Sequence, residues 1–266
     1  MQSLTTFEVT HSMNPKLEQR YPGVTFGNHP SIGSNVRIGT GTIIGHNVVL
    51  HDDTIIGNDV RIDDGSVVGK LPLRSRLSAV TRSVSLSPAV VGDRSLLGTY
   101  AVLYRGATIG EDVLIADFAS VREQTSIGDL TIIGRGVAIE NQVRIGMRCK
   151  IETGAYITAM STIQDLCFVA PEVTLTNDNY IGRTEERLKH FRGATLERGA
   201  RIGANATVLP GVVIGADALV AAGSVVTRHV VPRMIAMGAP ARLVRVVPSE
   251  QLLPALLQMK HVAGEV

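Results

Sequence analysis

The chain has 266 residues, 44% of them hydrophobic, but it has no Trp and only five Phe and five Tyr, which excludes a core built on bulky aromatic side chains. The 26 basic and 24 acidic residues leave a net charge of +2, too balanced for a protein that binds nucleic acid or a membrane surface through charge. We find no apolar stretch long enough for a membrane span, no signal peptide and only two cysteines, so we expect a cytoplasmic protein without a disulfide framework.

A six-residue period begins after a lead-in of residues 1–25. Each hexad starts with an aliphatic residue, often followed by Gly, and continues with two polar residues and a small one. The first block has hexads that start at Ile32, Ile38, Ile44, Leu50, Ile56, Ile62 and Val68. Residues 74–90 then interrupt the period, which predicts a first loop.

The second block is the longest and starts a hexad every six residues from Val91 to Leu175. Its fifth positions are never occupied by a large side chain: Ser95, Ala101, Ala107, Val113, Ala119, Thr125, Thr131, Val137, Val143, Cys149, Ala155, Ser161, Cys167 and Val173. A second loop is predicted at residues 181–195. The third block has hexad starts at Leu196, Ile202, Val208, Ile214, Val220 and Val226.

This pattern predicts an all-β fold, a narrow parallel β-solenoid with three short strands per coil and aliphatic side chains stacked inside. Three hexads per coil give about nine coils and a length on the order of 43 Å at the spacing of paired strands. A helix is excluded because no helical face repeats every six residues. Residues 26–247 form one solenoid, and residues 248–266, with Ser249 as an N-cap, predict a short helix over its open end.

The repeat resembles that of the hexapeptide acyltransferases, which implies a left-handed parallel β-helix. The stretch GANATVLPGVVIGADALVAAGSVVTRHVVPRMIAMGAPAR is similar to the coenzyme A end of such enzymes. The segment APEVTLTNDNYIGRTEER is similar to the subgroup that acylates amino groups of nucleotide-linked sugars. The resemblance implies a homotrimer with sites between subunits that uses acetyl-CoA, needs no metal and N-acetylates a UDP- or dTDP-linked 3-amino or 4-amino sugar for surface polysaccharide.

Residues 18 positions apart should lie above one another on neighbouring coils, and both loops then leave the solenoid from the same edge. The third hexad positions form a column along this edge: Lys70, Arg105, Glu123, Asn141, Ala159 and Asn177. The second positions form a neighbouring column: Gly69, Tyr104, Arg122, Glu140, Thr158 and Thr176. A polar strip flanked by two loops predicts a cleft, and a pair of solvated insertions is the alternative.

Acylation of an amine by a thioester needs a neutral nitrogen, a proton acceptor and a donor for the developing oxyanion. The resemblance places the histidine that many relatives use as a base at the position of Ala159, so this chain lacks it. We expect Glu140 and Asn141 to orient the amine and accept its proton, with Glu123 one coil further away. A polar ladder without catalytic meaning is the alternative for these residues.

Binding residues are expected on both sides of this centre. Basic residues of the first loop are candidates for holding a diphosphate, or else a solvated charge run. The substrate-binding candidates are Lys70, Arg74, Glu123, Asn177, Asp178, Tyr180 and Arg183. Two further pairs of residues are candidates for binding coenzyme A. Ala204 and Ala222 stack, and their small side chains would leave backbone N–H groups open to the pantetheine arm. The resemblance places Gly238 and Arg242 near the adenosine diphosphate.

Other functions remain open. A metalloenzyme resembling the γ-class carbonic anhydrases would need ligands such as His29, His46 and His51, although His51 lies on a different face from His46. A non-catalytic scaffold is a second alternative, which the coenzyme A-like stretch disfavours. An O-acetyltransferase is a third, but an alcohol nucleophile has a stronger need for a base than an amine.

Overall fold

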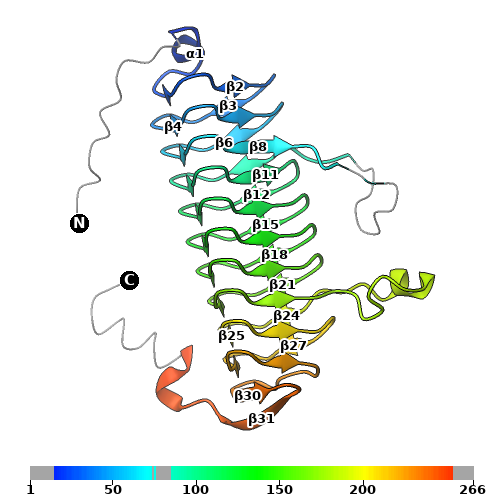
Figure 1. Cartoon of the computed structure of the whole chain (residues 1–266). Coiled ribbons are helices and arrows are strands. Elements are labelled where there is room, and N and C mark those ends of the chain that lie inside the picture. The colour runs from blue at the N-terminus through cyan, green and yellow to red at the C-terminus, as the bar shows by residue number, and fades with distance from the viewer. Residues whose placement is uncertain (1–14, 74, 76–84, 254–266) are drawn as a thin grey trace.

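The computed structural model describes residues 15–73, 75 and 85–253 and shows a parallel β-solenoid of about 11 turns, consistent with the left-handed β-helix that the sequence predicts (Figure 1). A short helix, α1 (Pro15–Arg20), precedes the first coil. The described part of the chain contains no helix long and apolar enough to cross a membrane. The first loop is described only in part, because residues 74 and 76–84 lie outside the described ranges.

The strands form three sheets, which we name A, B and C, and from β1 to β30 successive strands along the chain lie in different sheets and pair in parallel with the strands of neighbouring coils. Sheet A contains β1 (Thr25–Phe26), β4 (Ile43–Ile44), β7 (Arg61–Ile62), β10 (Leu96–Leu97), β13 (Leu114–Ile115), β16 (Ile132–Ile133), β19 (Lys150–Ile151), β22 (Phe168–Val169), β25 (Arg201–Ile202), β28 (Leu219–Val220), β30 (Met234–Gly238) and β31 (Ala241–Val246). Sheet B contains β2 (Ser31–Ile32), β5 (Val49–Leu50), β8 (Val67–Lys70), β11 (Val102–Tyr104), β14 (Ser120–Val121), β17 (Ala138–Ile139), β20 (Tyr156–Ile157), β23 (Thr174–Leu175), β26 (Thr207–Val208) and β29 (Val225–Val226). Sheet C contains β3 (Arg37–Ile38), β6 (Ile55–Ile56), β9 (Val90–Val91), β12 (Thr108–Ile109), β15 (Ser126–Ile127), β18 (Arg144–Ile145), β21 (Thr162–Ile163), β24 (Thr195–Leu196) and β27 (Val213–Ile214).

Every predicted hexad start is the second residue of a strand, from Ile32 in β2 to Val226 in β29. From Ile44 onward these aliphatic side chains are buried and form the core. Neighbouring strands pair in register, so that Ile139 pairs with Ile157 one coil later. The expected number of about nine coils was too low, because β1 and β30 extend sheet A beyond the hexads counted in the sequence.

The fifth hexad positions explain why the coil can be so narrow. All of the residues predicted there in the second block are buried. Three of the hydroxyl-bearing residues at this position donate to a carbonyl of the next coil: Ser95 to Gly110 at 2.9 Å, Thr125 to Glu140 at 3.0 Å and Thr131 to Gly146 at 2.9 Å. A small residue thus lets the chain turn, and the hydroxyl groups of Ser95, Thr125 and Thr131 are satisfied by the neighbouring coil.

The glycine that follows many of the aliphatic residues is required by the close stacking of coils. A Cβ added at Gly39 would lie 2.5 Å from the backbone of Gly57 on the next coil. Such contacts would force neighbouring coils apart, which is why the pattern places a residue without a side chain there.

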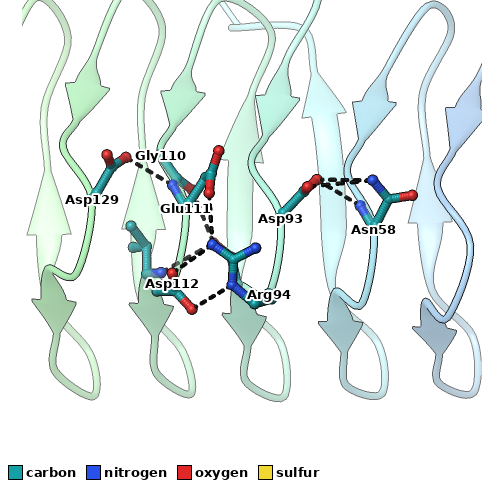
Figure 2. A network of polar contacts seen from close by, with 9 residues as sticks. Asn58, Asp93, Arg94, Gly110, Glu111, Asp112 and Asp129 are labelled. Carbon is teal, nitrogen blue, oxygen red and sulfur yellow. Dashed lines mark hydrogen bonds and ion pairs between the residues drawn. The ribbon is translucent and has the colours of Figure 1, made fainter.

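The edge where the chain passes from sheet C to sheet A is occupied by a polar ladder (Figure 2). The Asp93 carboxylate accepts a hydrogen bond from the backbone N–H of Asn58 at 2.8 Å, and this bond holds the pKa of Asp93 below its usual value. Arg94 pairs with Asp112 at 2.8 Å and with Glu111 at 2.6 Å. This edge therefore satisfies its own polar groups from coil to coil and stabilises the stack.

The C-terminal end of the solenoid is covered by a hairpin and a 3-10 turn, whereas the sequence predicted a short helix. Strands β30 and β31 form an antiparallel hairpin that extends sheet A. It is followed by a 3-10 turn, Ser249–Gln251, in which Pro248 and not Ser249 is the N-cap residue. Residues 254–266 of the expected helix lie outside the described residues.

We predict that Ala119→Leu lowers the free energy of unfolding by about 2 kcal/mol, because the larger side chain overpacks a fully buried fifth position. Chemical denaturation monitored by circular dichroism measures the change. Ser126→Leu is the matched control, since Ser126 is exposed on the outer face of β15, and its effect should stay within about 0.5 kcal/mol. Equal stability of the two variants would contradict the role given to the fifth position.

Candidate functional site

The two loops leave the solenoid at one edge, where the chain passes from sheet B to sheet C, and we call this the B/C edge. The first loop connects β8 to β9 and the second connects β23 to β24, and the two excursions project to the same side of the stack (Figure 1). The coils rejoin in register after each loop, since Ile56 pairs with Val91 and Ile163 with Leu196. The prediction that both loops share an edge is confirmed.

The predicted polar strip forms a connected set of contacts along this edge. The ring of Tyr104 lies between two cations, with Lys70 Nζ 5.4 Å and the Arg122 guanidinium 5.5 Å from its centroid. Arg122 pairs with Glu123 at 2.9 Å and with Glu140 at 3.2 Å. Arg122 is therefore shared by two carboxylates.

A cavity of about 230 Å³ lies further along the same strip, beside the second loop, and we call it the edge pocket. Its wall comes from β20, from the residues that directly follow β17 and β20, and from the second loop between β23 and β24. The lining residues are Glu140, Tyr156, Thr158, Ala159, Asn177, Asp178, Arg187 and Phe191. The structure therefore brings Glu140, Asn177 and Asp178 together, as the sequence predicted, around the position of Ala159.

Other predicted residues lie close to the edge pocket without lining it. Asn141 is 1% exposed beneath the strip, and its carbonyl accepts a hydrogen bond from the N–H of Met160 on the next coil at 3.1 Å. Glu123 is 4% exposed, and both of its carboxylate oxygens accept hydrogen bonds from Arg122. Their roles toward a substrate stay predictions.

Tyr156 is a pocket residue that the sequence did not single out, because its position on the outer face of β20 is occupied by small or β-branched residues in neighbouring strands. Burial and then the negative charge of Glu140 raise the pKa of Tyr156, while a hydrogen bond with Thr158 acts in the opposite direction. The phenol therefore stays protonated and remains a hydrogen-bond donor at the pocket wall.

Asp178 organises the second loop from inside. Its carboxylate accepts hydrogen bonds from the N–H groups of Tyr180 at 2.8 Å and Gly182 at 3.0 Å, and it pairs with Arg187 at 3.0 Å. Partial burial acts to raise the pKa of Asp178, but these three contacts outweigh it and hold the pKa below its usual value. Asp178 thus fixes Arg187 at the pocket wall, where the Arg187 guanidinium lies 5.4 Å from the ring centroid of Phe191.

The remaining loop candidates have other surroundings. Tyr180 stacks on His190 with 5.8 Å between ring centroids, and Arg183 is exposed. Lys70 lies on the strip next to Tyr104, three coils from Glu140. Arg74 lies outside the described residues.

The coenzyme A candidates lie away from the edge pocket. Ala204 and Ala222 stack where the chain passes from sheet A to sheet B, and the Ala204 carbonyl accepts from the N–H of Gly223 at 2.8 Å. Gly238 ends β30 and Arg242 lies in β31, where its side chain is exposed. Within one chain these residues and the edge pocket therefore occupy different edges.

The carbonic anhydrase alternative gains no support from the histidines. The Nδ1 atom of His46 accepts a hydrogen bond from the backbone N–H of Asn28 at 2.8 Å, so its lone pair is engaged in the stack. No group of three or more His, Cys, Asp or Glu side chains within the described ranges is placed to hold a metal ion.

Comparison with known families supports the repeat directly. The family model for the bacterial transferase hexapeptide repeat matches residues 29–64 and 193–228, and the model for the hexapeptide repeat of succinyl-transferase matches residues 88–116 and 124–159. The chain belongs to the hexapeptide-repeat family of transferases. No curated protein matches the sequence of this hexapeptide-repeat protein.

Solved structures of the same kind resemble this hexapeptide-repeat protein over parts of its length. A hexapeptide-repeat acetyltransferase from Vibrio cholerae is 25% identical over 46% of this chain and 74% of its own, with a TM-score of 0.39. A GDP-perosamine N-acetyltransferase from Caulobacter crescentus, solved with CoA and GDP-perosamine, is 26% identical over 54% of this chain and 56% of its own, with a TM-score of 0.38. A UDP-N-acetylglucosamine acyltransferase from Arabidopsis is 18% identical over 92% of this chain and 77% of its own, with a TM-score of 0.46.

The structure adds Tyr156, Arg187 and Phe191 to the residues expected at the pocket. Phe191 and Arg187 had no signal in the sequence because the second loop has no periodicity that would predict which of its side chains fold back. Tyr156 had a weak signal, as one of the few aromatic residues of the chain.

We predict that Asp178→Asn loosens the second loop, since the neutral amide loses the ion pair with Arg187 and one of its two acceptor oxygens. Hydrogen exchange followed by mass spectrometry should show faster exchange of the amides of Tyr180 and Gly182. Asp129→Asn is the matched control, because Asp129 accepts a backbone N–H in the ladder on another edge. Unchanged protection of the loop in Asp178→Asn would refute this role.

Lowering the pH should reproduce the effect in the native protein. A carboxyl group whose pKa is lowered by folding contributes stability above its unfolded pKa and loses this contribution as the pH falls toward the folded value. The Asp178 contacts should therefore persist at neutral pH and weaken only below about pH 4, the ordinary range for an aspartate.

Proposed function

We propose that this hexapeptide-repeat protein transfers an acyl group from acyl-CoA, with acetyl-CoA as the expected donor, to the amino group of a UDP- or dTDP-linked 3-amino or 4-amino sugar. The observation that supports it most is the edge pocket, which places the Glu140 carboxylate beside a cavity of about 230 Å³ whose lining includes no histidine. The cavity has the size and mixed polarity that suit one sugar ring.

The acceptor amine would lie next to Glu140. Arg122 donates to one oxygen of this carboxylate at 3.2 Å, and the other oxygen would accept the hydrogen bond of the amine. Because Arg122 is shared by two carboxylates, the site favours a positively charged group, so it would collect the amine and orient it without a strong base. An alcohol acceptor gains nothing from this charge and would need a base, which disfavours the O-acetyltransferase alternative.

The reaction then needs few groups from the protein. The bound ammonium group first loses one proton through Glu140 to solvent. The neutral amine then forms a bond with the thioester carbonyl carbon, the C–S bond breaks, and the second proton passes from the nitrogen through Glu140 to the departing thiolate. Tyr156 and Thr158 are the hydroxyl groups at the pocket wall that can donate to the oxyanion, and Tyr156 stays protonated for this purpose. Asn177 and the loop residue Arg187 would hold hydroxyl groups of the sugar.

Binding of coenzyme A at Ala204, Ala222, Gly238 and Arg242 fits the proposal if the edge pocket of one chain faces the A/B edge of another. A homotrimer with sites between subunits would provide this arrangement. The outer face of sheet A exposes Ile43 by 40% and Leu96 by 45%, which is apolar surface that a neighbouring subunit could cover. The cytoplasm, where acyl-CoA and nucleotide sugars are available, is the proposed location.

The test of the activity is a thiol-release assay of the purified chain with acetyl-CoA. The acceptor panel contains UDP- and dTDP-linked 3-amino and 4-amino sugars, together with the corresponding hydroxyl sugars. We expect release of CoA with one or more amino sugars and none with the hydroxyl sugars. Release with the hydroxyl sugars alone would overturn N-acylation in favour of O-acylation, and carbon dioxide hydration with bound zinc would overturn acyl transfer.

We predict that Glu140→Gln reduces kcat at least about tenfold with little change in thermal stability, because Arg122 keeps its pair with Glu123. Glu111→Gln is the matched control, since Glu111 is an exposed carboxylate that also pairs with an arginine, on the edge between sheets C and A. A Glu140→Gln variant with the kinetics of the native protein would remove Glu140 from the mechanism.

A further inference from the structure

A second, larger cavity of about 570 Å³ lies on the same B/C edge, toward the C-terminus, and we call it the basic pocket. Its walls come from the return of the second loop, from the turn between β26 and β27, and from the segment that follows β29. The lining residues are Arg192, Pro210, Gly211, Val212, Thr227, Arg228 and His229.

The ionisable side chains that line the basic pocket are all basic. Its lining contains Arg192, Arg228 and His229 but no Asp or Glu. Among the residues that the structure describes, none of these three side chains takes part in an ion pair. This contrasts with Arg94 and Arg122, which the solenoid surrounds with carboxylates. Cations gathered in a concave surface without counter-charges attract an anion of matching size.

The backbone builds this pocket in a specific way. Gly211 has a φ of 71°, and a Cβ there would lie 2.8 Å from Cδ of Arg192, so the glycine makes room for the arginine stem. The Nδ1 atom of His229 accepts the backbone N–H of Val213 at 3.0 Å. This bond leaves Nε2 as the ring nitrogen that carries hydrogen, and the ring is held in position as a donor.

The basic pocket and the edge pocket are neighbours. Phe191 lines the edge pocket, and the next residue, Arg192, lines the basic pocket. Along the stack, the edge pocket is centred near β20, whereas the basic pocket lies near β26 and β29. At about 4.8 Å per coil, two to three coils place the two centres roughly 10–14 Å apart along the solenoid axis. A substrate with a phosphate group at one end could therefore occupy both.

We propose that Arg192, Arg228 and His229 bind the phosphate groups of one of the two co-substrates while its reactive end lies in the edge pocket. Guanidinium groups bind phosphate oxygens in pairs of parallel hydrogen bonds, and the His229 Nε2–H adds a third donor. This inference rests on the proposed acyl transfer only for the identity of the ligand, because phosphate binding itself needs no reaction. The phosphates belong either to coenzyme A or to the nucleotide diphosphate of the acceptor.

Isothermal titration calorimetry of the full chain with two probes tests the site and identifies the source. Adenosine 3′,5′-bisphosphate represents the phosphate end of coenzyme A, and UDP represents the acceptor. We expect Arg192→Ala/Arg228→Ala to weaken the binding of one probe at least about tenfold, because charge-assisted contacts to phosphate are lost. The probe whose binding weakens identifies the co-substrate that supplies the phosphate groups.

The matched control is Arg198→Ala, because Arg198 is also exposed but lies where the chain passes from sheet C to sheet A, outside both pockets. It should bind both probes as the native protein does. Unchanged affinity for both probes in the double variant, with native thermal stability, would overturn the basic pocket as a phosphate site.

Kinetics separate this inference from the proposed function. If acyl transfer is observed, the double variant should raise KM for one co-substrate and leave KM for the other and kcat nearly unchanged. If acyl transfer fails with every acceptor, the calorimetric result still decides the phosphate site. His229→Gln should weaken the same probe less than the double arginine variant, since it removes one donor and no permanent charge.

Discussion

Each coil of this protein must supply the hydrogen-bond partners of the next coil, and this requirement controls the rest of the structure. The strands are only two residues long in most places, so no strand is stable without the strands above and below it. In-register pairing, such as that of Val121 with Ile139, places equivalent residues in columns along the stack. Because a one-residue shift would turn the aliphatic side chains outward, the register cannot slip locally.

The same constraint explains where functional groups can lie. The edge between sheets C and A uses its polar side chains to bond one coil to the next, as Asp93 does with Asn58, and it has few groups left for a ligand. At the B/C edge the chain departs twice and rejoins in register, so these insertions leave the ladder intact. The second loop can therefore fold back over the column and create the edge pocket on one side and the basic pocket on the other.

Much of this arrangement was predictable from the sequence because the period is short and strict. The aliphatic position of each hexad, the small fifth position and the common edge of the loops all follow from counting, and the structure confirms them. Counting also placed Glu140 and Asn177 near Ala159, and the two residues do line one cavity with it. Such positions are fixed by the coils alone.

Features that depend on irregular backbone were not predictable. The second loop has no period, so its sequence did not show that Asp178 binds its own loop or that Phe191 and Arg192 face two different cavities. The hairpin of β30 and β31 escaped prediction because its residues follow the last hexad and pair antiparallel. The hexad count likewise missed β1, in which Phe26 takes the place of an aliphatic residue.

The central claim is that the edge pocket receives the acceptor amine beside Glu140. The most direct measurement is a crystal structure of the chain with coenzyme A and the amino sugar nucleotide that is active in the thiol-release assay. The account predicts electron density for the sugar between Tyr156 and Phe191, with its amine within hydrogen-bond distance of the Glu140 carboxylate. Density for the sugar at another edge of the solenoid, with the edge pocket occupied only by solvent, would contradict it.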